Sequence, residues 1–138
     1  MVLYPLKFHP IIKERIWGGT KLGSVLNKPN NSSTIGESWE ISLVEGSVSV
    51  VTNGSLEGTD LLSLIKKHKD ALLGKKIYQQ FGEQFPLLIK FIDAQKDLSI
   101  QVHPDDTLAK KRHNSFGKTE MWYVMQACLL YTSPSPRD

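Results

Sequence analysis

Short stretches of the chain alternate hydrophobic and polar residues, a period of two that predicts β-strands. The stretches 36–43 and 47–51 alternate in this way. Residues 2–17 alternate more loosely and are interrupted by Pro5 and Pro10, which favours an extended segment at a sheet edge over a helix. The N-terminal part of the chain is therefore expected to supply strands, one of them at an edge.

Three further strands are predicted in the second half of the chain. Residues 86–93 are so continuously apolar that they predict a strand covered on both faces. Residues 98–103 form a second candidate, which Pro104 ends, and residues 119–126 form a third that is rich in aromatic and branched side chains. The fold is therefore expected to be mainly β.

Two helices are predicted between these strands. Residues 59–73 carry an apolar stripe at helical spacing, with Thr59 or Asp60 as the N-cap and Gly74 where a left-handed C-cap belongs. A short second helix is expected over residues 105–112, where acidic residues precede the first turn.

Composition and charge narrow the classes of partner. Seventeen Lys and Arg against fourteen Asp and Glu give a net charge of +3, which suits an anionic small molecule and is too mild to predict nucleic-acid binding. The lysines gather around helix 59–73 without interleaved aromatic residues, so a solvated face explains them better than nucleic acid does. A single cysteine excludes an intrachain disulfide framework and a Cys-rich zinc finger.

Targeting and membrane signals are not found in the sequence. No stretch approaches the roughly 20 apolar residues of a membrane span. Pro5 and Lys7 stand where a secretory signal would need an uninterrupted apolar run. We therefore expect no membrane partner and a cytoplasmic location.

The end of the predicted strand 98–103 carries candidate metal ligands. Residues two apart point to the same face of a strand, so Gln101 and His103 can converge on one ion, with Ser99 on the same face. Imidazole is a common zinc ligand. A histidine at a strand end is also commonly an ordinary surface residue, so both readings stay open.

The predicted strand 119–126 brings a second set of polar groups. Lys118, Glu120 and Trp122 would share one face, which gives a cation, a carboxylate and an aromatic wall. Lys118 and Glu120 can also form a plain surface ion pair, which contributes little to stability. A histidine and a carboxylate on separate strands nevertheless form a ligand set of the open, catalytic type.

Lys90 lies among continuous apolar residues in the stretch 86–93. Its side chain either extends along apolar surface to an edge or points into the interior. Unpaired burial would cost several kcal/mol, so an interior lysine needs an anionic partner. The sequence leaves both placements open.

Beyond these separate signals, the chain resembles a known family. The stretch FPLLIKFIDAQKDLSIQVHPDD, followed by GKTEMWYV, resembles the core of type I mannose-6-phosphate isomerases (phosphomannose isomerases), especially the bacterial members. The opening PLKFHPIIKERIWGGTKLG and the segments GESWEIS and SVVTNGSLEG are similar to the same family, so the resemblance covers about residues 4–127. The combination of QVHP and KTE with the IWGG opening is specific to that family.

The resemblance implies a cupin-like (jelly-roll) β-barrel, incomplete in this chain, that binds one zinc ion per subunit and interconverts mannose 6-phosphate and fructose 6-phosphate. It also implies two groups of site residues: Gln101, His103 and Glu120 as metal ligands, and Lys90, Ser99 and Lys118 around the sugar phosphate. Trp17 and Glu37 match family positions without a firm role, and Trp39 is expected to pack in the core.

The chain also departs from the family pattern. Family members are much longer, and their later strands supply a further histidine ligand and an arginine near the reacting centre. Residues 1–127 are therefore expected to be the N-terminal part of the cupin domain, and the Ser/Pro-rich residues 128–138 a foreign or disordered tail. We expect this chain alone to bind zinc weakly and to have little isomerase activity. The alternative is a non-catalytic, cupin-like module that binds a sugar or sugar phosphate.

Overall fold

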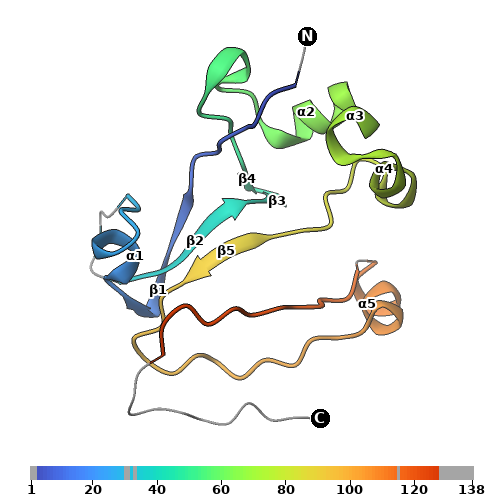
Figure 1. Cartoon of the computed structure of the whole chain (residues 1–138). Coiled ribbons are helices and arrows are strands. Elements are labelled where there is room, and N and C mark those ends of the chain that lie inside the picture. Colours follow the sequence, from blue (N-terminus) through green and yellow to red (C-terminus); the bar gives the residue numbers. More distant parts are fainter. Residues whose placement is uncertain (1–2, 30–31, 33, 115, 128–138) are drawn as a thin grey trace. The chain divides into compact units, whose positions relative to one another are not determined.

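The computed structural model forms two compact units, Met1–Leu98 and Ser99–Asp138 (Figure 1). The structure describes residues 3–29, 32, 34–114 and 116–127. The tail predicted over residues 128–138 lies outside the described residues. No helix in the described part of the chain is long and apolar enough to cross a membrane.

A three-stranded antiparallel sheet forms the centre of the first unit. Its order is β1 (Ile11–Gly19), β2 (Ile35–Ile41) and β5 (Ile89–Ile92), so β1 lies at an edge, as the two prolines before it predicted. A separate ribbon joins β3 (Leu43–Val44) to β4 (Ser47–Val48). Within the described residues the strands form no closed barrel, and the predicted mainly β fold class is confirmed.

The register of β2 decides which side chains share a face of this sheet. Directly opposed residues of an antiparallel pair point to the same side. Glu37 is opposite Lys13 of β1, and Trp39 is opposite Lys90 of β5, so these four residues share one face. Ser38 points to the other face. The centre of the sheet is thus lined with polar and charged side chains.

The hydrophobic core does not include these polar residues of the sheet. It lies where the N-terminal segment meets the residues that follow β4. Val51, Leu56 and Leu64 are buried there. Partly buried apolar residues pack against them: Leu3, Tyr4, Leu6, Phe8 and Leu72. Tyr4 also donates its hydroxyl proton to the carbonyl of Asn53 at 2.7 Å, next to the 3-10 helix η1 (Gly54–Leu56). The N-terminal segment is therefore held by both packing and hydrogen bonds.

The single helix predicted over residues 59–73 is interrupted. The structure has α2 (Leu61–His68) and α3 (Asp70–Leu73), separated by Lys69, whose φ of +49° lies in the left-handed region. Residues 66–70 offer no apolar side chain to the core, so packing does not hold this stretch in one continuous helix. The prediction of one helix was wrong because it relied on the local helix propensity of the lysines, whereas tertiary contacts decide whether the helix continues.

The predicted helix ends are partly confirmed. Asp60 is the N-cap of α2 and accepts a hydrogen bond from the backbone N–H of Ser63 at 2.9 Å. Gly74, with φ of +83°, follows α3. A helix that the sequence did not predict, α4 (Lys75–Phe81), comes directly after it. The loop-rich stretch before β2 contains the short helix α1 (Lys21–Ser24).

The helix expected over residues 105–112 is confirmed as α5 (Asp106–His113) in the second unit. Its N-cap is Asp105, whose carboxylate accepts from the backbone N–H of Leu108 at 2.7 Å.

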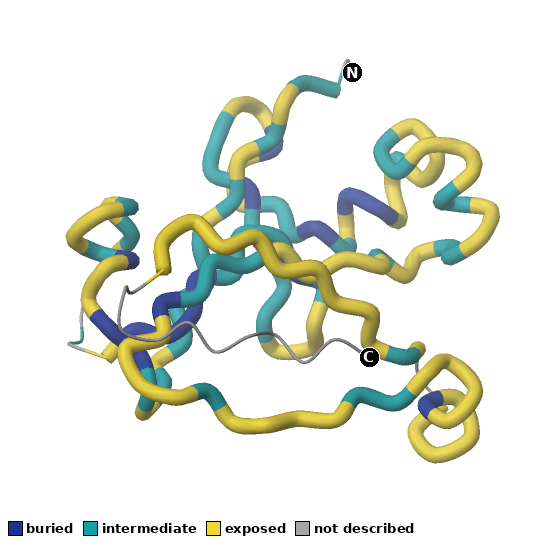
Figure 2. Tube along the Cα trace, turned by 60° about the horizontal axis from the view of Figure 1, so that its bottom comes forward, coloured by how far each residue is buried: buried dark blue, intermediate teal, exposed yellow. Residues whose placement is uncertain are grey.

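Two of the predicted strands are not formed. Residues 98–103 and 119–126 have no strand assignment and are mostly exposed along their length (Figure 2). Ile100, for example, is 99% exposed. A strand requires a hydrogen-bonded neighbour, and the described residues supply no ladder for these segments.

The strand β5 is also shorter than predicted, and it is not covered on both faces. Leu87, Leu88 and Ile89 are exposed. The apolar run alone indicated burial, whereas within the described residues β5 pairs only with β2. Similarly, the predicted strand 47–51 forms only β4 and two isolated bridges, at Val50 and Val51.

Candidate functional site

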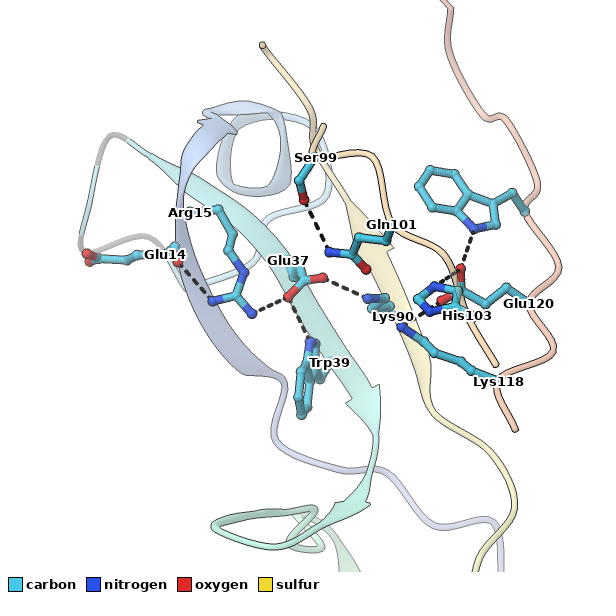
Figure 3. A network of polar contacts seen from close by, with 11 residues as sticks. Glu14, Arg15, Glu37, Trp39, Lys90, Ser99, Gln101, His103, Lys118 and Glu120 are labelled. Carbon is cyan, nitrogen blue, oxygen red and sulfur yellow. Dashed lines mark hydrogen bonds and ion pairs between the residues drawn. The ribbon is translucent and has the colours of Figure 1, made fainter. Parts of the chain in front are cut away.

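Two segments of the second unit carry five of the six predicted site residues, and the sixth, Lys90, belongs to the first unit. Gln101 donates its Nε2 to the hydroxyl of Ser99 at 3.1 Å. His103 Nε2 lies 3.4 Å from Glu120 Oε2, and Lys118 Nζ lies 3.0 Å from Glu120 Oε1 (Figure 3). The predicted group around Glu120 is therefore brought together within this unit.

A glycine allows the two segments to meet beside α5. The backbone N–H of Gly117 donates to Asp106 Oδ1 at 2.8 Å, and the N–H of Lys118 donates to the carbonyl of Pro104 at 3.4 Å. A Cβ at position 117 would lie 2.7 Å from backbone atoms of Asp105 and Asp106, too close for any side chain. Gly117 thus permits the approach that sets Glu120 beside His103.

The surroundings of Glu120 favour its ionised form. The hydrogen bond from Lys118 has the largest influence on the pKa of Glu120 and lowers it; partial burial opposes this effect. The pKa of Glu120 is lowered further by the charge of Lys118, a hydrogen bond from Trp122 Nε1 and the charge of His103. It therefore lies below its ordinary value. The carboxylate form, which is the form that ligates metals, is present at neutral pH.

The separation of the imidazole and the carboxylate fits a shared metal ion. Two ligands bound at about 2.0–2.1 Å to a tetrahedral zinc ion lie about 3.3 Å apart. His103 Nε2 and Glu120 Oε2 are 3.4 Å apart, a distance longer than the usual N–H···O hydrogen bond. Among the described residues, no three His, Cys, Asp or Glu side chains lie close enough together to hold a metal ion. The side-chain amide of the third candidate ligand, Gln101, contacts the hydroxyl of Ser99.

A second polar cluster occupies the sheet of the first unit, centred on Glu37. Lys90 Nζ donates to Glu37 Oε1 at 2.7 Å, and Arg15 Nη2 donates to Oε2 at 2.7 Å (Figure 3). The Trp39 indole N–H also donates to Oε2, at 3.3 Å. The Glu37 side chain is 7% exposed, and both of its oxygens are bonded. We call these four residues the Glu37 cluster.

The Glu37 carboxylate is charged although it is buried. Burial disfavours the charged form and pulls the pKa of Glu37 upward, and this is the largest single influence on it. The hydrogen bond and charge of Lys90, helped by Trp39 and Arg15, outweigh burial and hold the pKa below its ordinary value. The cluster therefore contains one anion and two cations.

The structure answers one question about Lys90 that the sequence left open. Lys90 has the anionic partner that an interior lysine needs, and its side chain is 22% exposed. Trp39, by contrast, was wrongly expected to pack in the core. It is half-buried, donates to Glu37, and its ring lies 4.7 Å from the Lys13 ammonium. The reason is that Trp39 shares the polar face of β2.

Sequence reasoning missed Arg15. The register between β1 and β2 shifts on both sides of Glu14, and such an irregularity cannot be read from alternation. Gly36 makes the room: a Cβ there would lie 2.5 Å from Arg15 Cβ and Cγ and 2.7 Å from the Trp17 ring. The sequence signal that could have indicated Arg15 is Gly36, the small residue next to Glu37. Its lack of a side chain leaves space for a long side chain from the neighbouring strand.

Comparison with known proteins decides the family. Residues 5–123 match the family model described as phosphomannose isomerase type I, catalytic domain. The chain belongs to this family. The predicted recognition is thereby confirmed, and so is the class of enzyme to which the chain's relatives belong.

Individual relatives agree with this assignment. Mannose-6-phosphate isomerase ManA of Bacillus subtilis (strain 168) is 43% identical over 126 residues, which cover 91% of this chain and 38% of the relative. Mannose-6-phosphate isomerase of Streptococcus mutans is 39% identical over 123 residues, which cover 89% of this chain and 37% of the relative. The chain thus spans less than two fifths of the length of these phosphomannose isomerases.

Solved structures of phosphomannose isomerases share the fold. The mannose 6-phosphate isomerase from Bacillus subtilis superposes with a TM-score of 0.74 at 36% identity, covering 83% of this chain and 35% of that one. The enzyme from Salmonella typhimurium, solved bound to fructose 6-phosphate and zinc, gives a TM-score of 0.66 at 31% identity, with coverage of 79% and 28%.

Proposed function

We propose that this chain carries the N-terminal part of the site of a zinc-dependent aldose–ketose isomerase that interconverts mannose 6-phosphate and fructose 6-phosphate. The observation that carries the proposal is the separation of 3.4 Å between His103 Nε2 and Glu120 Oε2, close to that of two ligands on one zinc ion. Membership of the family and the zinc and sugar phosphate bound to the Salmonella typhimurium relative support it.

The proposed metal ligands are Gln101, His103 and Glu120. A zinc ion held there would act as a Lewis acid that polarises the oxygens on the two carbons between which a proton moves. The residues prepare this site in two ways: Lys118 hydrogen-bonds the Glu120 carboxylate and lowers its pKa, and Gly117 allows the two segments to approach.

The remaining residues would bind and orient the substrate. Lys90 and Lys118 each offer a point charge that attracts the sugar phosphate, and Lys118 lies 3.0 Å from the proposed ligand Glu120. Ser99 would also lie beside the sugar phosphate, and its hydroxyl, which accepts from Gln101, would fix the orientation of that amide. Positioned cations stabilise negative charge that develops on the substrate oxygens during isomerisation.

A zinc titration of the purified 138-residue chain tests the metal site. We expect weak binding of one zinc ion, because the three proposed ligands lie on mostly exposed segments that no strand pairing holds in place. His103→Ala and Gln101→Ala should weaken zinc binding by about tenfold or more each. His113→Ala, at the exposed end of α5, is the matched control and should leave binding unchanged. Equal loss in the H113A control would contradict the assignment.

A coupled assay for fructose 6-phosphate tests the activity. We propose that this chain alone turns over mannose 6-phosphate far more slowly than a full-length relative. Turnover close to that of a relative would overturn that part of the proposal. Binding of mannose 6-phosphate that is unaffected by zinc or by His103→Ala would instead favour a non-catalytic sugar-phosphate binding module.

A further inference from the structure

The Glu37 cluster contains more charge than the stability of the sheet requires. A buried ion pair is weak evidence for stability, because desolvation of the charges offsets much of their attraction. Glu37 nevertheless lies at the centre of the sheet with a cation on each carboxylate oxygen. An apolar side chain would fill the same position at smaller electrostatic cost. The arrangement therefore calls for an explanation other than packing.

Geometry indicates what the cluster does to Lys90. A lysine ammonium is a mobile point charge on a flexible stem with three donors. In this chain one donor is fixed on Glu37 Oε1 at 2.7 Å. Glu37 is itself held from its other oxygen by Arg15 and Trp39. A fixed ammonium has less side-chain freedom to lose when it meets an anion, which favours binding.

The charge balance explains why Arg15 is needed. Glu37 with Lys90 alone would be neutral and would attract no anion. Arg15 brings the group of three to a net charge of +1, so the site stays cationic while Lys90 is held in place. The Arg15 side chain is 39% exposed, so its effect is screened by solvent and is smaller than that of the buried carboxylate.

We propose that Glu37 is a positioning residue that fixes the Lys90 ammonium for a sugar phosphate, and that Arg15 keeps this arrangement cationic. The proposal rests on the proposed function, in which Lys90 meets the substrate phosphate. It adds roles for Glu37 and Arg15.

The same unit contains a matched control pair. Lys28 Nζ lies 2.8 Å from Glu40 Oε2, with side-chain exposures of 18% and 23%. Ser38 donates to Glu40 at 2.6 Å, so this pair belongs to the opposite face of the sheet. Partial unfolding of the unit should make both Lys90 and Lys28 more accessible. Loss of a single ion pair should change the accessibility of only the lysine that belonged to it.

The test measures the acylation rate of individual lysines by mass spectrometry on the full 138-residue chain. In Glu37→Gln we expect the Lys90 rate to rise by about tenfold, as for loss of one charge-assisted hydrogen bond, while the Lys28 rate stays constant. Glu40→Gln should give the reverse pattern, and Glu37→Asp should restore part of the slow Lys90 rate. An unchanged Lys90 rate in E37Q, or equal acceleration of both lysines, would overturn the positioning role.

The same measurement in the presence of ligands distinguishes the positioning role of Glu37 from the proposed function. Mannose 6-phosphate should slow acylation of Lys90 in the unaltered chain, and this protection should weaken several-fold in E37Q and in Arg15→Gln. Mannose, which lacks the phosphate, should not protect, and inorganic phosphate should protect partly. If E37Q frees Lys90 but mannose 6-phosphate never protects it, the proposed function fails while the positioning of Lys90 stands. Full protection in R15Q would overturn the role of Arg15.

Discussion

The two units contain the same local pattern, a glutamate followed two residues later by a tryptophan whose indole donates to it. Glu37 and Trp39 form this pair at 3.3 Å, and Glu120 and Trp122 form it at 3.5 Å. A lysine binds each carboxylate: Lys90, from another strand, binds Glu37, and Lys118, two residues before Glu120, binds Glu120. Extended backbone explains the recurrence, because residues two apart project to the same side.

The difference between the two glutamates lies in what surrounds each pair. Glu37 has paired strands on both sides and a second cation, and its side chain is 7% exposed. Glu120 lies on a segment without a ladder, is 29% exposed and faces His103. The same local motif therefore holds a buried carboxylate between two cations in one unit and a more exposed carboxylate beside a histidine in the other, depending on the partners that long-range contacts supply.

The largest expected effect is on stability, and it should separate the two glutamates. Glu37→Ala removes the partner of two cations, and breaking a buried pair costs about 3–5 kcal/mol, which we reduce to about 2–3 kcal/mol because Arg15 is well exposed. Glu120→Ala should cost less than about 1 kcal/mol, as for a surface pair. Urea unfolding curves of both variants give the comparison.

An equal loss of stability in both variants would contradict this difference. The unfolding slope should stay the same in each, since a changed slope would mean an altered denatured or native state and not a lost contact.

The next effect concerns zinc and should be confined to the second unit. Zinc at about 100 times its dissociation constant stabilises the state that binds it by about 2.7 kcal/mol. We expect it to slow amide hydrogen exchange over residues 99–127, around His103 and Glu120. Residues 3–98 should be unchanged and serve as the internal control. Slower exchange in the β1–β2–β5 sheet alone would contradict a metal site in the second unit.

Gly117→Ala should change zinc binding in the second unit and leave the first unit unchanged. The added Cβ meets backbone at 2.7 Å, and such overpacking typically costs about 1–3 kcal/mol. Displacement of the segment that carries Glu120 should weaken zinc binding by about tenfold, measured by titration. The acylation rates of Lys90 and Lys28 in the first unit should not move. An unaltered zinc affinity would show that the close contact of Gly117 with the start of α5 does not determine the distance between His103 and Glu120.

Local spacing predicted that Lys118 and Trp122 lie on the same side as Glu120, whereas the pairing of Glu120 with His103 rested on the family resemblance; for the Glu37 cluster local spacing failed. Lys118 and Glu120 are close in sequence, and the spacing of an extended segment already puts them together. Glu37 and Lys90 are 53 residues apart, so only the strand register joins them. Arg15 was missed because its position depends on the irregular pairing of β1.

The fold shows the same limit. Helix α5 could be predicted because its N-cap, Asp105, and its body are adjacent in sequence. The stretches 98–103 and 119–126 have strand-like composition, yet a strand exists only where another strand bonds to it. Alternation therefore predicts an extended backbone and does not predict its neighbour.

The smallest effect is on the pH dependence of stability, and it again distinguishes the two carboxylates. The pKa of Glu37 is lowered in the folded chain, so its contribution to the free energy of unfolding is fully present above the ordinary value of 4.5 and is lost as the pH falls toward the folded value. Glu37→Gln should therefore be less stable than the unaltered chain at pH 7, and the gap should close as the pH is lowered through this range. Glu120→Gln should show a shallower change of the same sign, because the pKa of Glu120 is also lowered but its side chain is more exposed. Unfolding curves at several pH values between neutral and acid measure both, and a gap for E37Q that widens toward acid pH would mean that Glu37 is stabilised in its protonated form, against the geometry of the cluster.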